Sequence, residues 1–136
     1  MLEENKALVR RYYQQVMGDL AEIESLVADG FVDHHFPRDT PPGPAGVRQF
    51  FQGFAQKVFS DMRIDIQRML AEGDLVDCHF VLHARHTGEM AGIAPQGNLI
   101  RLPAISTFRI ADEKLAEAWE IFDSASLLAQ MRGDAG

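Results

Sequence analysis

The chain is almost without cysteine, since Cys78 is the only one in its 136 residues. A single cysteine can form no disulfide within the chain, which is typical of proteins in a reducing compartment, and we expect a cytoplasmic location. Cys78 lies in a strand-like run, where its neighbour His79 points to the opposite face and leaves no base beside the thiol. We therefore interpret Cys78 as a small apolar core residue, with a nucleophile as the alternative.

Positive charge is also scarce. The chain has 13 lysines and arginines against 20 aspartates and glutamates, which gives a net charge of −7. This balance argues against nucleic-acid binding, which normally needs a basic patch, and against adhesion to an anionic membrane surface. No apolar run approaches the roughly 18–20 residues that span a bilayer. The start, MLEENKALVRR, is charged and helical in pattern, unlike a signal peptide. We expect neither nucleic acid nor membrane as a partner.

The first half of the chain has apolar residues at helical spacing. The pattern predicts a helix that ends at Gly18, a second that Asp19 caps and Gly30 ends, and a third after a proline-rich loop at 37–46. Between them, Phe31–Phe36 is too short for a helix and predicts a strand or extended segment. The apolar faces of the three helices are Leu8, Val9, Tyr12, Tyr13 and Val16; Leu20, Ile23, Leu26 and Val27; and Val47, Phe50, Phe51, Phe54 and Val58.

The second half has the pattern of long strands joined by turns. Strands are predicted at Met62–Leu70, Leu75–Thr87, Leu99–Ile110 and Leu115–Phe122, with a loop at 88–98 and a short final helix around Leu127, Leu128 and Met131. Helices at the front and antiparallel strands behind indicate a single α+β domain over 1–136. We expect three N-terminal helices to cover one face of a bent sheet that curls around a conical cavity.

The outward positions of the predicted sheet are only half polar. His79, His83, Arg85 and Arg109 alternate there with apolar or weakly polar residues, namely Val81, Ile105 and Thr107. A partly apolar sheet face on a small acidic domain predicts that a second copy covers it, so we expect a homodimer.

The last predicted strand ends on a carboxylate. Trp119, Ile121 and Asp123 share one strand parity, so their side chains point to the same face. If that face lines a cavity, Asp123 lies in an apolar mouth where burial raises its pKa and makes it an acid–base group. The alternative is that Asp123 caps a helix that begins at Ser124.

Five stretches follow one another in a specific order: ALVRRYYQQV, GDLAEIESLVADGFVDHH, PPGPAGVRQFFQGF, HTGEMAGIAPQGN and FRIADEKLAEAWEIFD. Over roughly Asn5 to Leu128 the chain resembles the SnoaL-like polyketide cyclases, which share the cone-shaped fold of nuclear-transport-factor-like proteins and ketosteroid isomerases. The resemblance implies an aldol-type ring closure, or a related proton transfer, on a hydrophobic polyketide- or steroid-like ketone, without a metal or other cofactor. The alternative is a non-catalytic module of the same fold that binds a small hydrophobic ligand.

The resemblance also implies roles for single residues. Asp123 matches the aspartate that ends the pattern E-x-W-x-x-x-D and would be the acid–base. Tyr12 falls where the isomerases place their oxyanion-hole tyrosine. His35 falls near the isomerases' base, whereas the family's D-H pattern favours His34. Because adjacent strand residues point opposite ways, we expect at most one of the two histidines to face the cavity. Each of these four could instead be structural.

We expect further side chains to contact the substrate, with a purely structural role as the alternative for each: Trp119, His86, Phe108, Ser106, Phe54 and Phe80. Two positions depart from the family. Ser106 stands where an aspartate or histidine is common, and Ala118 stands where a histidine is common. The partner histidine is thus missing unless His34, His35 or His86 replaces it. This departure favours the binding module. The predicted combination of Tyr12, His34 or His35 and Asp123 among apolar walls favours the enzyme.

Overall fold

The computed structural model describes residues 1–134, so the last two residues of the predicted domain, 135–136, lie outside it. None of the described helices is both long and apolar enough to cross a membrane. The elements in chain order are α1 (Leu2–Val16), α2 (Ile23–Leu26), β1 (Val27–Asp33), α3 (Gly43–Phe50), the π-helical η1 (Phe51–Ala55), α4 (Gln56–Val58), β2 (Phe59–Glu72), β3 (Leu75–His86), β4 (Leu99–Ala111), β5 (Lys114–Phe122) and α5 (Ser124–Arg132).

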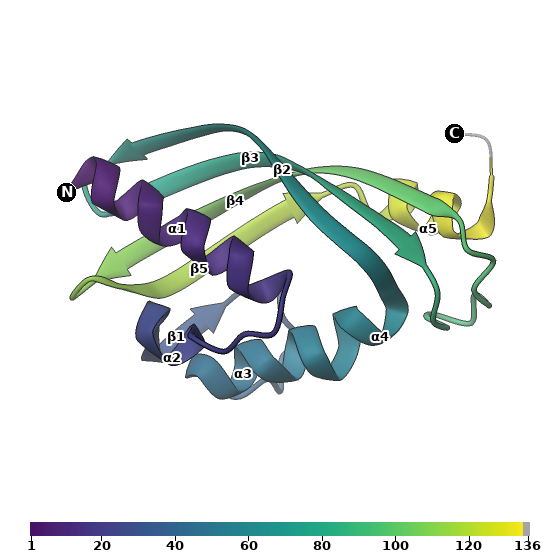
Figure 1. The fold of residues 1–136 in the computed structure, drawn as a ribbon, viewed down its shortest axis with the longest axis horizontal. Helices are drawn as coiled ribbons and strands as arrows, with labels where there is room; N and C mark the ends of the chain where they lie inside the picture. Colours follow the sequence, from purple (N-terminus) through teal and green to yellow (C-terminus); the bar gives the residue numbers. More distant parts are fainter. Residues whose placement is uncertain (135–136) are drawn as a thin grey trace.

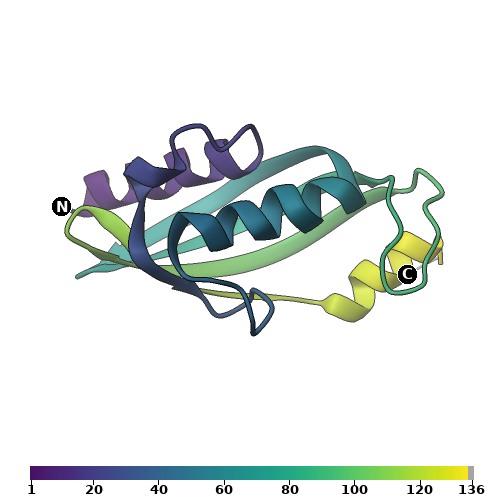
Figure 2. The ribbon, with the colours of Figure 1, turned by 90° about the horizontal axis from the view of Figure 1, so that it is seen from below.

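The strands form one curved five-stranded sheet in the order β1-β5-β4-β3-β2 (Figure 1). β1 runs parallel to β5, and the other pairs are antiparallel, so the sheet is mixed. α1 and the continuous stretch from α3 to α4 lie over the sheet, while α5 and the loop after β3 gather at the end far from the N-terminus (Figure 2). The predicted α+β fold with a curved sheet is confirmed.

The helical front half differs in detail from the three predicted helices. The second helix is a four-residue turn that begins at Ile23, because the Asp19 side chain accepts a hydrogen bond from the backbone nitrogen of Ala21 (3.0 Å) and stabilises a turn instead. Leu20 has a φ of 58°, in the left-handed region, which also stops a helix there. Val27 then begins β1 rather than ending a helix.

The core lies where the buried stripe of α1 packs on the inner face of the sheet. The stripe consists of the predicted residues Leu8, Val9, Tyr12, Tyr13 and Val16. Cys78 points into this core and is fully buried, and burial raises the pKa of its thiol to about 11. A thiol with so high a pKa is protonated at neutral pH, which agrees with its interpretation as a core residue.

Candidate functional site

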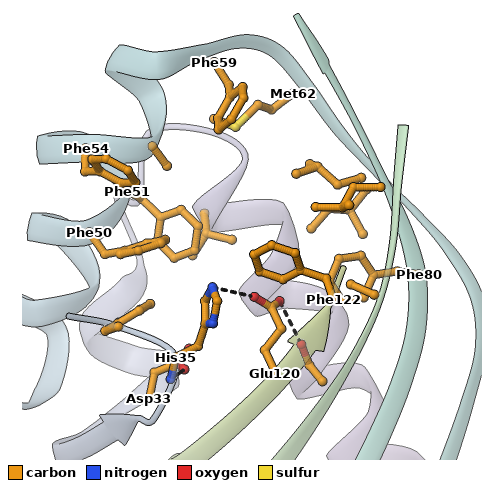
Figure 3. Close-up of a pocket in the computed structure, with 18 of the residues that line it drawn as sticks. Asp33, His35, Phe50, Phe51, Phe54, Phe59, Met62, Phe80, Glu120 and Phe122 are labelled. Atoms are coloured by element: carbon orange, nitrogen blue, oxygen red, sulfur yellow. Dashed lines mark hydrogen bonds and ion pairs between the residues drawn. The ribbon is translucent and has the colours of Figure 1, made fainter. Parts of the chain in front are cut away.

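A cavity of about 440 Å³ lies between the helices and the inner face of the sheet (Figure 3). Its volume falls in the range of small-molecule sites. Eight of the nine phenylalanines of the chain contribute to its wall, which is apolar and rich in aromatic rings. They are Phe36, Phe50, Phe51, Phe54, Phe59, Phe80, Phe108 and Phe122.

Four polar side chains meet at one end of this apolar cavity, and we call them the polar cluster: Asp33, His35, Ser106 and Glu120 (Figure 3). The Ser106 hydroxyl donates a hydrogen bond to Glu120 Oε1 (3.1 Å). The other carboxylate oxygen of Glu120 lies 3.5 Å from His35 Nε2. Ser106 and Glu120 are direct partners on β4 and β5, so the register of the sheet holds this contact.

Burial makes both carboxyl groups of the polar cluster weaker acids. It raises the pKa of Glu120, although the hydrogen bond from Ser106 works in the opposite direction. The pKa of Asp33 rises from 3.8 to about 6, first through burial and then through the negative charge of Glu120. A pKa near neutrality suits a group that both accepts and returns protons at physiological pH.

The turn after β1 determines which of the two adjacent histidines enters the cavity. Asp33 Oδ1 accepts a hydrogen bond from the backbone nitrogen of His35 (2.9 Å), and the backbone nitrogen of His34 donates to the carbonyl of Ala118 on β5 (2.9 Å). The His35 ring then packs edge-on against Phe122 in the cavity wall, with ring centroids 4.9 Å apart.

His34 turns the opposite way, outside the cavity. Its ring stacks on Trp119 with centroids 5.2 Å apart, and its Nε2 lies 2.6 Å from Glu117 Oε2. Of the two histidines that the sequence left open, only His35 therefore lines the cavity. A direct role for His34 in the cavity is not compatible with this geometry.

Tyr12 and Tyr13 come from α1 and also line the cavity. Their hydroxyls are buried and have no hydrogen-bond partner among residues 1–134. Burial raises the pKa of both phenols, and the negative charges of Asp33 and Glu120 add to the effect on Tyr12. Both hydroxyls thus stay protonated at physiological pH and can donate to an acceptor that enters the site.

The expectation that Asp123 faces the cavity is wrong. Asp123 is exposed and is the N-cap of α5, where its Oδ1 accepts a hydrogen bond from the backbone nitrogen of Ser126 (3.1 Å). The capping alternative is correct, because the chain leaves the sheet after Phe122 and the carboxylate satisfies a free N–H of the new helix.

The face assigned to Trp119 is also wrong. Residues directly opposite on antiparallel strands point to the same face. Phe108 and Ser106 point inward, so their β5 partners Ala118 and Glu120 do as well. Trp119 is consequently on the outer face, where it is 38% exposed.

The other predicted substrate contacts divide into two groups. His86 points inward as expected and is fully buried, but it packs near Phe59 beyond the cavity and is not part of the lining. Phe54, Phe80, Phe108 and Ser106 do line the cavity, and their contact with a substrate stays a prediction.

Sequence reasoning missed Glu120 and Asp33 as site residues. Glu120 could have been found from Ser106. Residues that are paired on antiparallel strands point to the same face, so the β5 residue beside the inward Ser106 also points inward, and in the EAWEIF run that residue is Glu120. Asp33 was not among the predicted site residues. Its signal was the short D-H-H turn, in which the first side chain caps the backbone of the third.

The chain matches a family model described as SnoaL-like polyketide cyclase over residues 7–131. Among solved structures it is similar to IdmH of Streptomyces antibioticus, a proposed polyketide cyclase (28% identity, 93% of this chain and 96% of that one, TM-score 0.79). A proposed polyketide cyclase of Bacillus cereus ATCC 10987 is also similar (25% identity, 97% and 83%, TM-score 0.79).

AclR of Streptomyces galilaeus, a proposed hydroxylase, shares the fold (22% identity, 100% of this chain and 85% of that one, TM-score 0.76). No curated protein matches the chain. The similar structures thus carry more than one proposed activity, and the reaction has to be argued from the site.

Proposed function

The chain belongs to the SnoaL-like polyketide cyclase family, and from this premise we propose that it is a cofactor-independent enzyme that transfers a proton beside the ketone of a hydrophobic substrate. The substrate class that we propose is polyketide- or steroid-like. The proposed reaction is an aldol-type ring closure or a related proton transfer that passes through the same enolate.

The observation that carries this proposal is the half-buried carboxylate of Glu120 in a largely apolar cavity. Ser106 holds one of its oxygens and the other faces His35, so the group has a fixed direction. We propose that Glu120 accepts the proton of the carbon next to the ketone, which leaves an enolate and a neutral carboxylic acid. A preoriented base in a dry site avoids the cost of reorganising water during the reaction.

The enolate oxygen then needs hydrogen-bond donors. We propose that His35 and Tyr12 supply them, because His35 Nε2 lies beside Glu120 and the Tyr12 hydroxyl is buried without a partner among residues 1–134. Glu120, now a neutral acid, returns its proton to the substrate, which restores the carboxylate, and the negative charge of Asp33 contributes to the tendency of Glu120 and Tyr12 to stay protonated. In a ring closure, the enolate carbon instead forms a bond to a carbonyl carbon of the same substrate, whose oxygen takes that proton.

The second candidate is a module of the same fold that binds a hydrophobic ligand without turnover. Ser106 stands where the family often has an aspartate or histidine, which favours this candidate, whereas the polar cluster favours the enzyme. Both candidates use the same cavity, so they differ in proton transfer and not in binding.

An exchange experiment separates the two. The probe is 2-tetralone, a bicyclic ketone with acidic protons beside its carbonyl, and proton NMR in D₂O follows the loss of those signals. We expect the protein to accelerate the exchange and Glu120→Gln to reduce the acceleration at least 100-fold, since loss of a general base typically costs 10²–10⁴.

The matched control is Asp123→Asn, which removes a carboxylate only three residues away but outside the cavity. We expect it to exchange at the rate of the unchanged protein. Exchange that persists in Glu120→Gln, or that falls in Asp123→Asn, would contradict the assignment of the base. Ligand binding without any accelerated exchange would favour the binding module.

We also propose that the protein forms a homodimer through the outer face of the sheet. Ile105 and Ile121 are adjacent on β4 and β5 and are 43% and 77% exposed. Trp119 lies on the same face, so these three apolar side chains would be covered by a second copy. The cytoplasmic location remains a proposal that rests on the single cysteine.

A further inference from the structure

Positive charge is scarce in this chain, but one end of the outer sheet face gathers it. Arg63 on β2, His83 on β3 and Arg101 on β4 are direct partners across three adjacent strands. Directly opposite residues of antiparallel strands point to the same face, so the three side chains form one row, which we call the basic row. Both arginines are exposed and His83 is half-buried between them. With about 5 Å between neighbouring strands, the two arginines start only about 10 Å apart.

The basic row has no counter-charge within the described part of the chain. Among residues 1–134, no carboxylate oxygen lies within 4.0 Å of a side-chain nitrogen of Arg63 or Arg101. This holds even for Asp65, the next outward residue of β2 after Arg63. By contrast, Arg109 at the other end of β4 donates to Glu117 on β5 (3.0 Å). Like charges that lie close together on a sheet are unfavourable, so the basic row favours a negative group from outside the chain.

Exposed apolar side chains border the basic row on β4. Leu99 is 71% exposed, Pro103 is also exposed, and Arg101 lies between them. The intervening Ile100 and Leu102 are buried, so all three exposed residues point outward. Arginine beside exposed apolar groups is typical of protein–protein interfaces. A nucleic acid fits less well, because its extended negative charge would meet a chain whose net charge is −7.

The basic row lies at the end of the sheet where α5 and the loop after β3 gather (Figure 1). Gln130 of α5 holds the backbone of β4 there, because its Oε1 accepts from the backbone nitrogen of Arg101 (2.7 Å) and its Nε2 donates to the carbonyl of Arg101 (3.0 Å). The apolar contact proposed for the homodimer is centred on Ile105 and Ile121 instead. Ile105 follows Arg101 by four residues, or about 13 Å along the strand, which leaves room for both contacts.

We infer that the basic row is a docking site for a protein partner whose surface presents carboxylates beside apolar side chains. The carboxylates of the partner pair with Arg63 and Arg101, and its apolar side chains cover Leu99 and Pro103. The docking site goes beyond the proposed function, since it depends on neither the cavity nor the reaction.

An acidic amphipathic peptide serves as the probe: an 18-residue helix of leucine and glutamate with the leucines on one face. The control peptide has glutamine in place of every glutamate. Backbone amide NMR spectra of the protein, recorded with each peptide at low salt, locate the contact. We expect the glutamate peptide to shift amides within residues 60–65, 81–85 and 99–103, and the glutamine peptide to bind at least 10-fold more weakly. No binding of the glutamate peptide, or shifts confined to another surface, would overturn the inference.

A charge-reversal variant tests the role of the two arginines. In Arg63→Glu/Arg101→Glu, the dissociation constant of the glutamate peptide, measured by fluorescence anisotropy, should rise at least 10-fold. The matched control, Arg10→Glu/Arg11→Glu, makes the same change in charge at exposed positions of α1 and should stay within 2-fold of the unchanged protein. An equal loss in the control would assign the binding to net charge and overturn the inference. If the charge-reversal variant fails to fold, the NMR experiment on the unchanged protein decides alone.

Two measurements separate this docking site from the other proposals. Sedimentation of Arg63→Glu/Arg101→Glu should show the same oligomer as the unchanged protein. Dissociation into monomers would mean that a second copy covers the basic row, and this would overturn the inference. The 2-tetralone exchange rate of the same variant should equal that of the unchanged protein, because neither arginine lines the cavity. Absence of exchange in the unchanged protein would contradict the proposed enzyme and leave the docking site standing.

Discussion

The half-buried carboxyl of Asp33 should destabilise the protein at neutral pH, and Asp33→Asn should therefore stabilise it. Burial and the nearby charge of Glu120 raise the pKa of Asp33 from 3.8 to about 6. The native protein thus binds a proton at Asp33 more tightly than the unfolded chain does. The asparagine keeps an oxygen that can accept the hydrogen bond from the backbone of His35. It removes only the charge.

The size of the effect follows from the two pKa values. Below about pH 4 the carboxyl is neutral in both states and the charge costs nothing. Between about pH 4 and pH 6 the unfolded chain ionises first, so stability is lost as the pH rises. Above pH 6 the difference of about 2 in pKa corresponds to a cost of up to about 3 kcal/mol, and partial exposure of the side chain lowers this toward about 1 kcal/mol.

Urea unfolding of the unchanged protein and of Asp33→Asn at pH 4 and pH 7.5 measures this cost. We expect the variant to be more stable by about 1–3 kcal/mol at pH 7.5 and equal within about 0.5 kcal/mol at pH 4. The control is Asp29→Asn, an exposed aspartate on the same strand, which should change stability by less than about 0.5 kcal/mol at both pH values. A variant that is less stable than the unchanged protein at pH 7.5 would refute the reasoning.

Three further outcomes are expected. Asp123→Ala should lose about 1 kcal/mol in urea unfolding, because Ser126 loses its N-cap acceptor, while the 2-tetralone exchange rate is unchanged; a slower exchange would contradict the capping role. His34→Ala should keep the rate of 2-tetralone exchange within about 2-fold of that of the unchanged protein, since the His34 ring lies outside the cavity. His35→Ala should reduce this rate at least 10-fold, since His35 lines the cavity. Ile121→Lys should shift sedimentation from dimer toward monomer; an unchanged sedimentation coefficient would contradict the proposed interface.

Sequence patterns predicted those parts of the fold in which only one face is apolar. The stripe from Leu8 to Val16 has polar residues on its other side, so its period defines the buried face. On β3 the alternation that places His79, His83 and Arg85 outward likewise identified the inner face, on which Cys78 and Phe80 are buried.

The pattern failed on β5 because both faces of that strand carry apolar groups. Trp119 and Ile121 are larger and more apolar than Ala118 and Glu120, so parity alone assigns them to the interior. Only the pairing with β4 decides the matter, and that pairing is a contact between residues far apart in the sequence. Asp33 and Glu120 were missed for the same reason, since they meet Ser106 only through the pairing of three strands, β1, β4 and β5.

The central claim is that the polar end of the cavity receives the ketone of the ligand, and a crystal structure with 2-tetralone bound tests it most directly. We expect the ring system against the phenylalanine wall, the carbonyl oxygen at hydrogen-bond distance from His35 or Tyr12, and the adjacent CH₂ about 3–3.5 Å from a Glu120 oxygen. A ligand bound with its carbonyl toward solvent, or bound outside the cavity, would contradict the account.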